Sequence, residues 1–419
     1  MRIKVENTYN LLLISILGIF LVFTSGSMRG INEFFNGKGY ALMGLSMVAT
    51  IYISIFYIIY SYILRGNINI IWGNIRIILM IGIFTLTGLY SSIDIVLTIK
   101  GIIYLLSYTL FSIVFVDQFK EQSFEYILKA LILVVVINII YMIIFPYNSI
   151  DISDSRFNLS LIGMFYHKNS LASFMSIANI AIIINLLNNS HSSKNYLIYI
   201  VMYIATLVFV LMSNSVTSLL ILLICNILVI LYKYLKFRVN IIINMVSFQI
   251  AFYVIILGSK YINDLLIKYI GRDLTLTGRV DIWKVLINLI NKKPLVGYGY
   301  GTVWNTEDMI SYITSSVGFD FLGSHNGPLQ IIMEVGFIGF FVFFVVFFLI
   351  PSFKVKNLNL EKTPLHMFIY IYYAYLLIYT ISEPTFDPEN FQTFLLIILT
   401  VYMNKEVVQQ NKYKLKEAL

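Results

Sequence analysis

Residues 279–301 have the sequence RVDIWKVLINLINKKPLVGYGYG, and they lie in a polar stretch that runs from Ser259 to His325. Long apolar runs flank this stretch on both sides. In the whole chain 59% of the residues are hydrophobic and 12% are charged, and the mean hydropathy is +0.84. A soluble globular domain carries about 25% charged residues. The sequence therefore predicts a membrane protein with one large external loop.

Helical segments that cross a bilayer need about 20 mainly apolar residues, and such segments recur along the chain. We expect about twelve of them, at residues 10–25, 40–64, 77–92, 95–117, 127–145, 170–187, 196–212, 215–232, 240–258, 326–350, 365–383 and 391–403. The predicted fold is all-α, a single polytopic membrane domain over residues 1–419. It divides into spans one to nine (1–258), the large extracytoplasmic loop (259–325), and spans ten to twelve with a cytoplasmic tail (326–419).

The distribution of lysine and arginine predicts the orientation. If Met1 starts inside, most basic residues fall in inside segments, and the short outside loops hold only Arg29, Lys38, Arg156 and Lys168. Cytoplasmic loops carry an excess of Lys and Arg. Both termini are thus predicted to be cytoplasmic, and the formal net charge of +8 is a topology signal. It does not indicate nucleic-acid binding.

Cysteine and histidine usage excludes two kinds of site. The single cysteine, Cys225, lies in an apolar run, so a disulfide framework and a cysteine-based metal site are both excluded. The four histidines are widely spaced and form no metal-binding motif. We therefore expect no metal site.

The large loop has its own helical patterns. Apolar residues at helical spacing predict a short amphipathic helix over Tyr261–Tyr269 and a second helix over Arg279–Asn291. The glycine-rich segment Gly297–Gly301 is predicted to be loop. The stretch is thus expected to form a small helical cap over the outer membrane face.

His325 lies where the chain enters the tenth predicted span, and an imidazole can accept a proton near neutral pH. Asn326, Gln330 and Glu334 follow at four-residue spacing, so one face of that helix is polar. Carboxylates within spans are functional candidates. The alternative is that His325 and Asn326 cap the helix while Gln330 and Glu334 bind neighbouring helices, and the spacing alone leaves both open.

Arginines outside the membrane are candidates for binding a diphosphate. Guanidinium groups bind phosphate oxygens in bidentate fashion and keep their charge. Arg279 and Arg156 are the main candidates, and Arg272 and Lys168 are candidates for supporting positive charge. The alternative for each is a solvated loop charge or a lipid-headgroup contact.

Aromatic residues around the glycine-rich segment are candidates for sugar stacking, namely Tyr298, Tyr300 and Trp304. The segment lacks the phosphate-loop pattern, and its glycines permit positive φ and close backbone approach. A tight turn flanked by interfacial aromatics is the structural alternative.

Lys100 lies in the middle of the fourth predicted span, where a charge is costly. We expect it to pair with Glu334 or Glu383, or to extend to the interface.

Several motifs occur in a characteristic order. They are Gly163-Met-Phe-Tyr-His-Lys-Asn169, Gly278-Arg279 with Trp283, Pro294 with Gly297, Gly299 and Gly301, and His325-Asn326 with Gly336 and Gly339. In this order, and with a large loop between spans nine and ten, the chain resembles the superfamily of O-antigen polymerases and O-antigen ligases. These are integral membrane glycosyltransferases of the bacterial envelope. The detailed resemblance covers residues 157–340.

The resemblance implies a GT-C-like fold and a metal-independent, inverting glycosyltransferase without a cofactor. Such an enzyme moves a glycan from undecaprenyl diphosphate to an acceptor hydroxyl outside the cytoplasmic membrane. His325 would correspond to the base, and Arg279 and Arg156 to arginines that hold the diphosphate. Arg156 lies seven residues before Gly163, where a shorter gap is usual. Implied partners are undecaprenyl-diphosphate-linked oligosaccharide, membrane lipids, and a flippase and chain-length regulator of the same pathway.

Three functions remain open, of which a polymerase is favoured. Its acceptor is another lipid-linked repeat unit, and its product is an O-antigen, capsule or exopolysaccharide. The low-charge, Ile-, Phe- and Tyr-rich composition is typical of polymerases. A ligase instead uses the lipid A core as acceptor. A flippase or transporter would show internal repeats and spans broken by Gly or Pro, and the sequence indicates neither.

Overall fold

The computed structural model describes residues 2–24, 28–34, 37–65, 69–151, 159–188, 193–235, 279–318, 323–357 and 363–417. The predicted span 240–258, the predicted helix Tyr261–Tyr269, Arg156 and Arg272 lie outside these residues.

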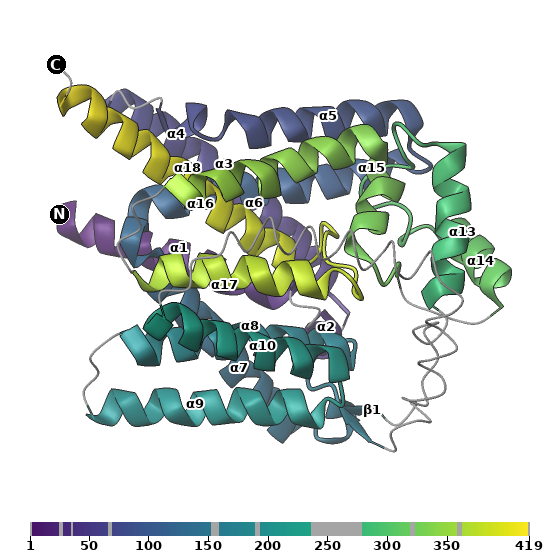
Figure 1. The fold of residues 1–419 in the computed structure, drawn as a ribbon, viewed down its shortest axis with the longest axis horizontal. Helices are drawn as coiled ribbons and strands as arrows, with labels where there is room; N and C mark the ends of the chain where they lie inside the picture. The colour runs from purple at the N-terminus through teal and green to yellow at the C-terminus, as the bar shows by residue number, and fades with distance from the viewer. Residues whose placement is uncertain are drawn as a thin grey trace.

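The described part is almost entirely helical (Figure 1). Its helices are α1 (Arg2–Thr24), α2 (Met28–Phe34), α3 (Gly39–Arg65), α4 (Asn69–Trp72), α5 (Ile75–Ser91), α6 (Ile95–Phe119), α7 (Ser123–Ile144), α8 (Lys168–Asn188), α9 (Ser193–Met212), α10 (Val216–Leu235), α13 (Arg279–Lys292), α14 (Glu307–Val317), α15 (Gly327–Phe344), α16 (Ile350–Asn357), α17 (Pro364–Tyr379) and α18 (Phe391–Glu417). A π-helical segment, Val345–Leu349, joins α15 to α16. Two short strands, β1 (Ile150–Asp151) and β2 (Ser160–Leu161), pair antiparallel with Ile150 opposite Leu161.

The predicted spans fall on described helices, except for 240–258. The all-α polytopic class is thereby confirmed. By length and apolar composition, 6 helical stretches of the described residues can cross a membrane, and one of them, Ile95–Ile144, runs through both α6 and α7. Shorter apolar helices occur in α1, α5, α17 and α18. The count of about twelve spans is not confirmed.

Both chain ends lie at one end of the helical bundle, and α13 and α14 lie at the other (Figure 1). Between them the helices run roughly along the long axis of the molecule. The described residues of the large loop therefore lie at the opposite end of the bundle from the two chain ends. Which side faces the cytoplasm remains a prediction from the lysine and arginine distribution.

Burial of the helices follows their apolar pattern. Almost every residue of α17 is buried, which suits a helix that is apolar all round. On α3, by contrast, the large side chains of Tyr52, Phe56 and Ile63 are more than two-thirds exposed. A surface of this kind is what contact with lipid tails requires.

The predicted helix over Arg279–Asn291 is confirmed as α13. It packs on α15 and α14 through a small apolar cluster that includes Ile282, Leu286 and Met333. These α13 positions share one face because they are four residues apart. The second helix of this region, α14, was not predicted.

Helix α15 is broken at Gly336, whose φ of 67° and ψ of −177° are not helical. The backbone groups released by the break bond to residues 294–299, and this is how a membrane protein tolerates an interrupted helix. The four bonds are Tyr298 N–H to Met333 O (3.0 Å), Gly299 N–H to Glu334 O (2.8 Å), Phe337 N–H to Pro294 O (2.8 Å) and Ile338 N–H to Leu295 O (3.3 Å). The expectation that no span is broken by glycine was therefore wrong.

Two motif glycines make this close approach possible. A Cβ on Gly336 would lie 2.2 Å from the carbonyl carbon of Leu295, and a Cβ on Gly297 would lie 2.5 Å from the carbonyl carbon of Glu334. Both glycines also have positive φ. The backbone of residues 294–299 thus supplies the hydrogen-bond partners that α15 lacks at its break.

Candidate functional site

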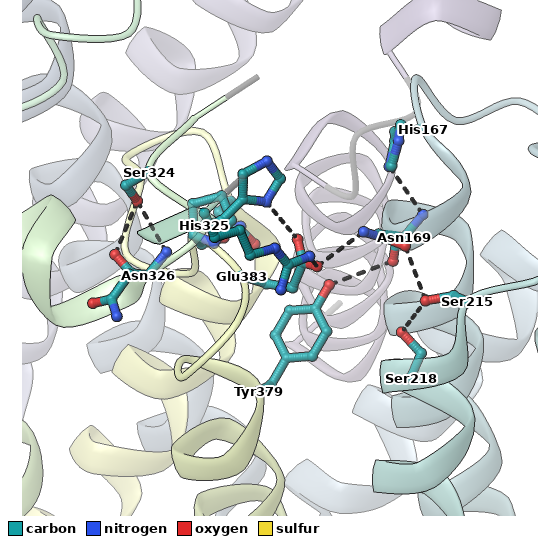
Figure 2. A network of polar contacts seen from close by, with 12 residues as sticks. His167, Asn169, Ser215, Ser218, Ser324, His325, Asn326, Tyr379 and Glu383 are labelled. Carbon is teal, nitrogen blue, oxygen red and sulfur yellow. Dashed lines mark hydrogen bonds and ion pairs between the residues drawn. The ribbon is translucent and has the colours of Figure 1, made fainter. Parts of the chain in front are cut away.

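Polar side chains from four separate segments meet at the end of the bundle that carries α13 (Figure 2). His325 precedes α15, Arg279 is the first residue of α13, Asn169 lies in the first turn of α8, and Glu383 lies in the loop after α17. Their side chains converge on the carboxylate of Glu383.

The backbone of His325 has an unusual conformation. Its φ is +48°, in the left-handed region that non-glycine residues rarely adopt. The side chain of Ser324 stabilises the turn at His325: its Oγ donates to the carbonyl of Asn326 (2.9 Å) and accepts from the N–H of Asn326 (3.2 Å). The buried indole of Trp283 donates to the carbonyl of Ser324 at 3.0 Å. Strained backbone of this kind is concentrated at functional sites.

Glu383 is 5% exposed and has three partners. Its Oε1 accepts from Arg279 Nη2 at 3.0 Å and from Asn169 Nδ2 at 2.9 Å, while its Oε2 lies 3.6 Å from Nδ1 of His325. Burial acts to raise the pKa of this carboxyl. The contact with His325 and the charge of Arg279 outweigh burial and hold the pKa below its usual range. Glu383 is therefore a buried anion at neutral pH.

Asn169 connects Glu383 to neighbouring helices. Its Oδ1 accepts from Ser215 Oγ (2.9 Å), which lies 3.1 Å from Ser218 Oγ in α10. Its carbonyl accepts from the hydroxyl of Tyr379, the last residue of α17 (3.4 Å), and its N–H donates to Nδ1 of His167 (3.2 Å). This network fixes the carboxylate relative to α8, α10 and α17 (Figure 2).

The predicted polar face of α15 is buried. Asn326 caps the helix through its side chain, Glu334 Oε2 accepts the N–H of Gly301 (3.1 Å), and Gln330 Nε2 donates to Asp387 Oδ2 (3.4 Å). These contacts join α15 to the glycine-rich segment and to the loop after α17. They match the structural alternative, and a direct catalytic role for the three residues stays a prediction.

The predicted sugar-stacking aromatics lie inside the packing. Tyr298 and Tyr300 are 5% and 0% exposed, and their hydroxyls donate to the carbonyls of Leu289 (2.9 Å) and Phe386 (3.1 Å). Trp304 packs against the apolar cluster of α13. Burial favours the structural use of these rings, and sugar stacking remains a prediction.

Lys100 does not pair with Glu334 or Glu383 as predicted. It forms an ion pair with Glu389 at 2.6 Å, with its side chain 43% exposed. The two predicted pairings were wrong because Lys100 lies close to the start of this span, which begins at Ile95 as predicted, and not in its middle. There the loop after α17 reaches it.

The loop 380–390 is the feature that sequence reasoning missed. The predicted span 365–383 was too long, since α17 ends at Tyr379. The loop carries three acidic residues, Glu383, Asp387 and Glu389. Burial of the Asp387 carboxyl and the charge of Glu389 raise the pKa of Asp387 to about 6. Two features of the sequence could have indicated these site residues. Glu383 is a carboxylate at the end of a predicted span, and Asn169 occupies a position of the motif that begins at Gly163.

Of the predicted diphosphate-binding arginines, only Arg279 lies among the described residues. The side chain of Lys168, a predicted helper, is buried at the start of α8. Within the same residues, no group of three or more His, Cys, Asp or Glu side chains is arranged to hold a metal ion.

Comparison with known proteins gives one family. Residues 201–344 match the family model described as O-antigen ligase. This range contains Arg279, the glycine-rich segment and His325, and it excludes Asn169 and Glu383. The match and the relatives below confirm the resemblance to the superfamily of O-antigen polymerases and ligases. Together with the apolar helices, they identify an integral membrane protein.

Curated relatives match over part of their length. A candidate polysaccharide ligase of Rickettsia felis is 27% identical over 248 residues, which cover 57% of this chain and 58% of that protein. A candidate polysaccharide ligase of Rickettsia prowazekii is 30% identical over 196 residues, 44% and 46% of the two chains. The exopolysaccharide production protein ExoQ of Rhizobium meliloti is 37% identical over 83 residues, 18% of each chain. The chain thus spans less than two thirds of each of these relatives.

Proposed function

We propose that the protein is a polysaccharide polymerase of the bacterial cytoplasmic membrane. It transfers a glycan from undecaprenyl diphosphate to a hydroxyl of another lipid-linked repeat unit on the extracytoplasmic side, with both termini in the cytoplasm. The observation that carries this proposal is the convergence of His325 and Arg279 on one buried carboxylate, Glu383. The family match, which includes both residues, supports it.

His325 acts as the base in this proposal. When Nδ1 carries the proton and faces Glu383, Nε2 is the nitrogen that accepts a proton from the acceptor hydroxyl. The hydroxyl oxygen then bonds to the anomeric carbon, and the bond from that carbon to the diphosphate oxygen breaks with its electron pair leaving on the diphosphate. One displacement of this kind inverts the anomeric configuration.

Arg279 stabilises the leaving group. A guanidinium has five N–H donors, and Arg279 uses Nη2 toward Glu383. Its other donors suit the diphosphate oxygens, on which negative charge grows in the transition state. Arg156 and Arg272 are proposed to add positive charge. Because a diphosphate is already a good leaving group, the proposal uses neither a metal nor a cofactor.

A ligase is the second candidate, because the matching family model is described as O-antigen ligase and two relatives are candidate polysaccharide ligases. The similarity to ExoQ, named for exopolysaccharide production, and the low-charge composition favour the polymerase. The two differ only in acceptor, since both need a base and a site for the diphosphate. A flippase and a chain-length regulator are proposed partners of the polymerase.

The test is a reconstituted transfer reaction. Purified protein is incubated with a lipid-linked repeat unit, with and without lipid A core, and products are followed by gel and mass spectrometry. We expect a polymer without lipid A core, and none from His325→Ala. His366→Asn is the matched control and should retain activity, because His366 lies at the other end of α17. Product that requires lipid A core would establish a ligase. An unconsumed donor, or full activity of His325→Ala, would refute the proposal.

A further inference from the structure

We infer that Glu383 is a positioning residue for the transfer reaction: its carboxylate orients the imidazole of His325 and the guanidinium of Arg279 together. The inference rests on the proposed function, in which these two groups face the acceptor and the donor. The residue lies outside the range matched by the family model. It comes from a loop whose role the sequence did not indicate.

The two carboxylate oxygens of Glu383 are divided between its partners. Oε1 takes Arg279 (3.0 Å) and Asn169 (2.9 Å), and Oε2 faces Nδ1 of His325 (3.6 Å). A buried carboxylate is tolerated only when charged groups and hydrogen bonds compensate its lost hydration. Removal of this carboxylate would therefore release both candidate reactive groups at once.

The position of Oε2 determines which nitrogen of His325 can act. An ionised carboxylate only accepts hydrogen bonds, so in the inferred arrangement Nδ1 carries the proton and Nε2 has the lone pair. After Nε2 takes a proton from the acceptor, the imidazolium lies beside an anion that stabilises it. At 3.6 Å the two atoms are beyond hydrogen-bond distance. Catalytic hydrogen bonds often tighten only in the substrate complex, and we expect this contact to shorten there.

The charges that face Glu383 decide the direction of a pH effect. Arg279 on α13 is the permanent cation among them, while His325 before α15 and His167 before α8 are titratable groups, and the hydroxyl of Tyr379 lies beside the network. Burial lowers the pKa of His167, so that imidazole is neutral near pH 7. Loss of the Glu383 charge would leave Arg279 as an unopposed cation near His325. A protonated His325 would then be less stable.

The experiment compares pH–rate profiles of kcat/KM for wild type, Glu383→Gln and Glu383→Asp in the reconstituted reaction. For Glu383→Gln we expect a fall on the order of 100-fold at the optimum, and an acid limb moved to lower pH by about one unit. Glu383→Asp keeps the charge, so its acid limb should stay near that of wild type while its rate falls. Glu389→Gln is the matched control from the same loop and should leave the acid limb in place.

In Glu383→Gln, a merely structural role would lower the rate at every pH without moving the acid limb, and that result would overturn the inference. A second readout, which needs no activity, is the NMR titration of ring-labelled histidine, which is tractable with 4 histidines. The His325 signal, assigned with His325→Gln, should titrate at lower pH in Glu383→Gln. If that variant does not fold, Glu383→Asp decides, because an acid limb displaced despite the retained charge contradicts the inference. An inactive wild-type protein would instead refute the proposed function.

Discussion

Replacement of Gly336 by alanine should destabilise the protein strongly. The φ and ψ of Gly336 belong to a region that is essentially open to glycine alone, at a cost of about 1–3 kcal/mol for another residue. The new Cβ would lie 2.2 Å from the carbonyl carbon of Leu295, so the glycine-rich segment must move away. That movement breaks the bonds from Phe337 N–H and Ile338 N–H, each worth about 1 kcal/mol net. Together these effects amount to roughly 3–5 kcal/mol.

The assay is thermal unfolding in detergent, followed by tryptophan fluorescence. At roughly 2–4 °C per kcal/mol, the midpoint of Gly336→Ala should fall by about 10 °C. Gly82→Ala is the matched control, since Gly82 lies in α5 with open space around its Cβ position. Alanine is favoured over glycine within a helix, so this control should unfold at or slightly above the wild-type midpoint. Equal midpoints for the two variants would refute our account of the break in α15.

Three further predictions concern the residues around the site. Trp283→Phe keeps an aromatic ring in the packing but loses the hydrogen bond to the carbonyl of Ser324. The unfolding midpoint should fall by a few degrees and the transfer activity should fall more steeply. Unchanged activity would show that this bond does not hold the His325 turn. Arg279→Lys cannot reproduce the planar fork, so kcat/KM in the reconstituted assay should fall at least about tenfold, whereas a wild-type value would assign Arg279 to structure alone. Because the pKa of Asp387 is raised to about 6, the native state holds a proton that the unfolded chain releases, and wild-type stability should fall as the pH rises from about 4 to 6. Asp387→Asn should remove this part of the pH dependence of the midpoint, and an identical fall in the variant would contradict the assignment.

Much of the helical architecture follows from local properties of the sequence. Segments such as α3, α8 and α10 were located because an apolar run of sufficient length has one favourable conformation in a bilayer. The helix α13 was located from its 3.6-residue apolar period. The end of α17 was misplaced, since apolar residues continue beyond the last helical turn and hydropathy does not register where a helix ends.

The candidate site was predicted only in part. His325 and Arg279 were singled out from residue type, position and motif, and the structure brings them together. Sequence reasoning assigned the polar face Gln330 and Glu334 to the same site, but their contacts lead to the glycine-rich segment and to Asp387. Helical periodicity tells which side chains share a face. It does not tell what that face packs against.

The sequence by itself determined the membrane class, the positions of most helices and the two residues proposed to carry the chemistry. Only the tertiary structure decided that Glu383 is their common partner. Arg279 and Asn169 lie 104 and 214 residues from Glu383 in the chain, and yet their side chains bind the same carboxylate oxygen. Composition and periodicity report on local structure, over a few helical turns. An ion pair between distant residues depends on how the whole chain folds, because folding decides which charges are buried next to each other. The polar stretch 259–325 thus indicated an external site from the sequence alone. The loop after α17 supplies Glu383, the anion that His325 and Arg279 share.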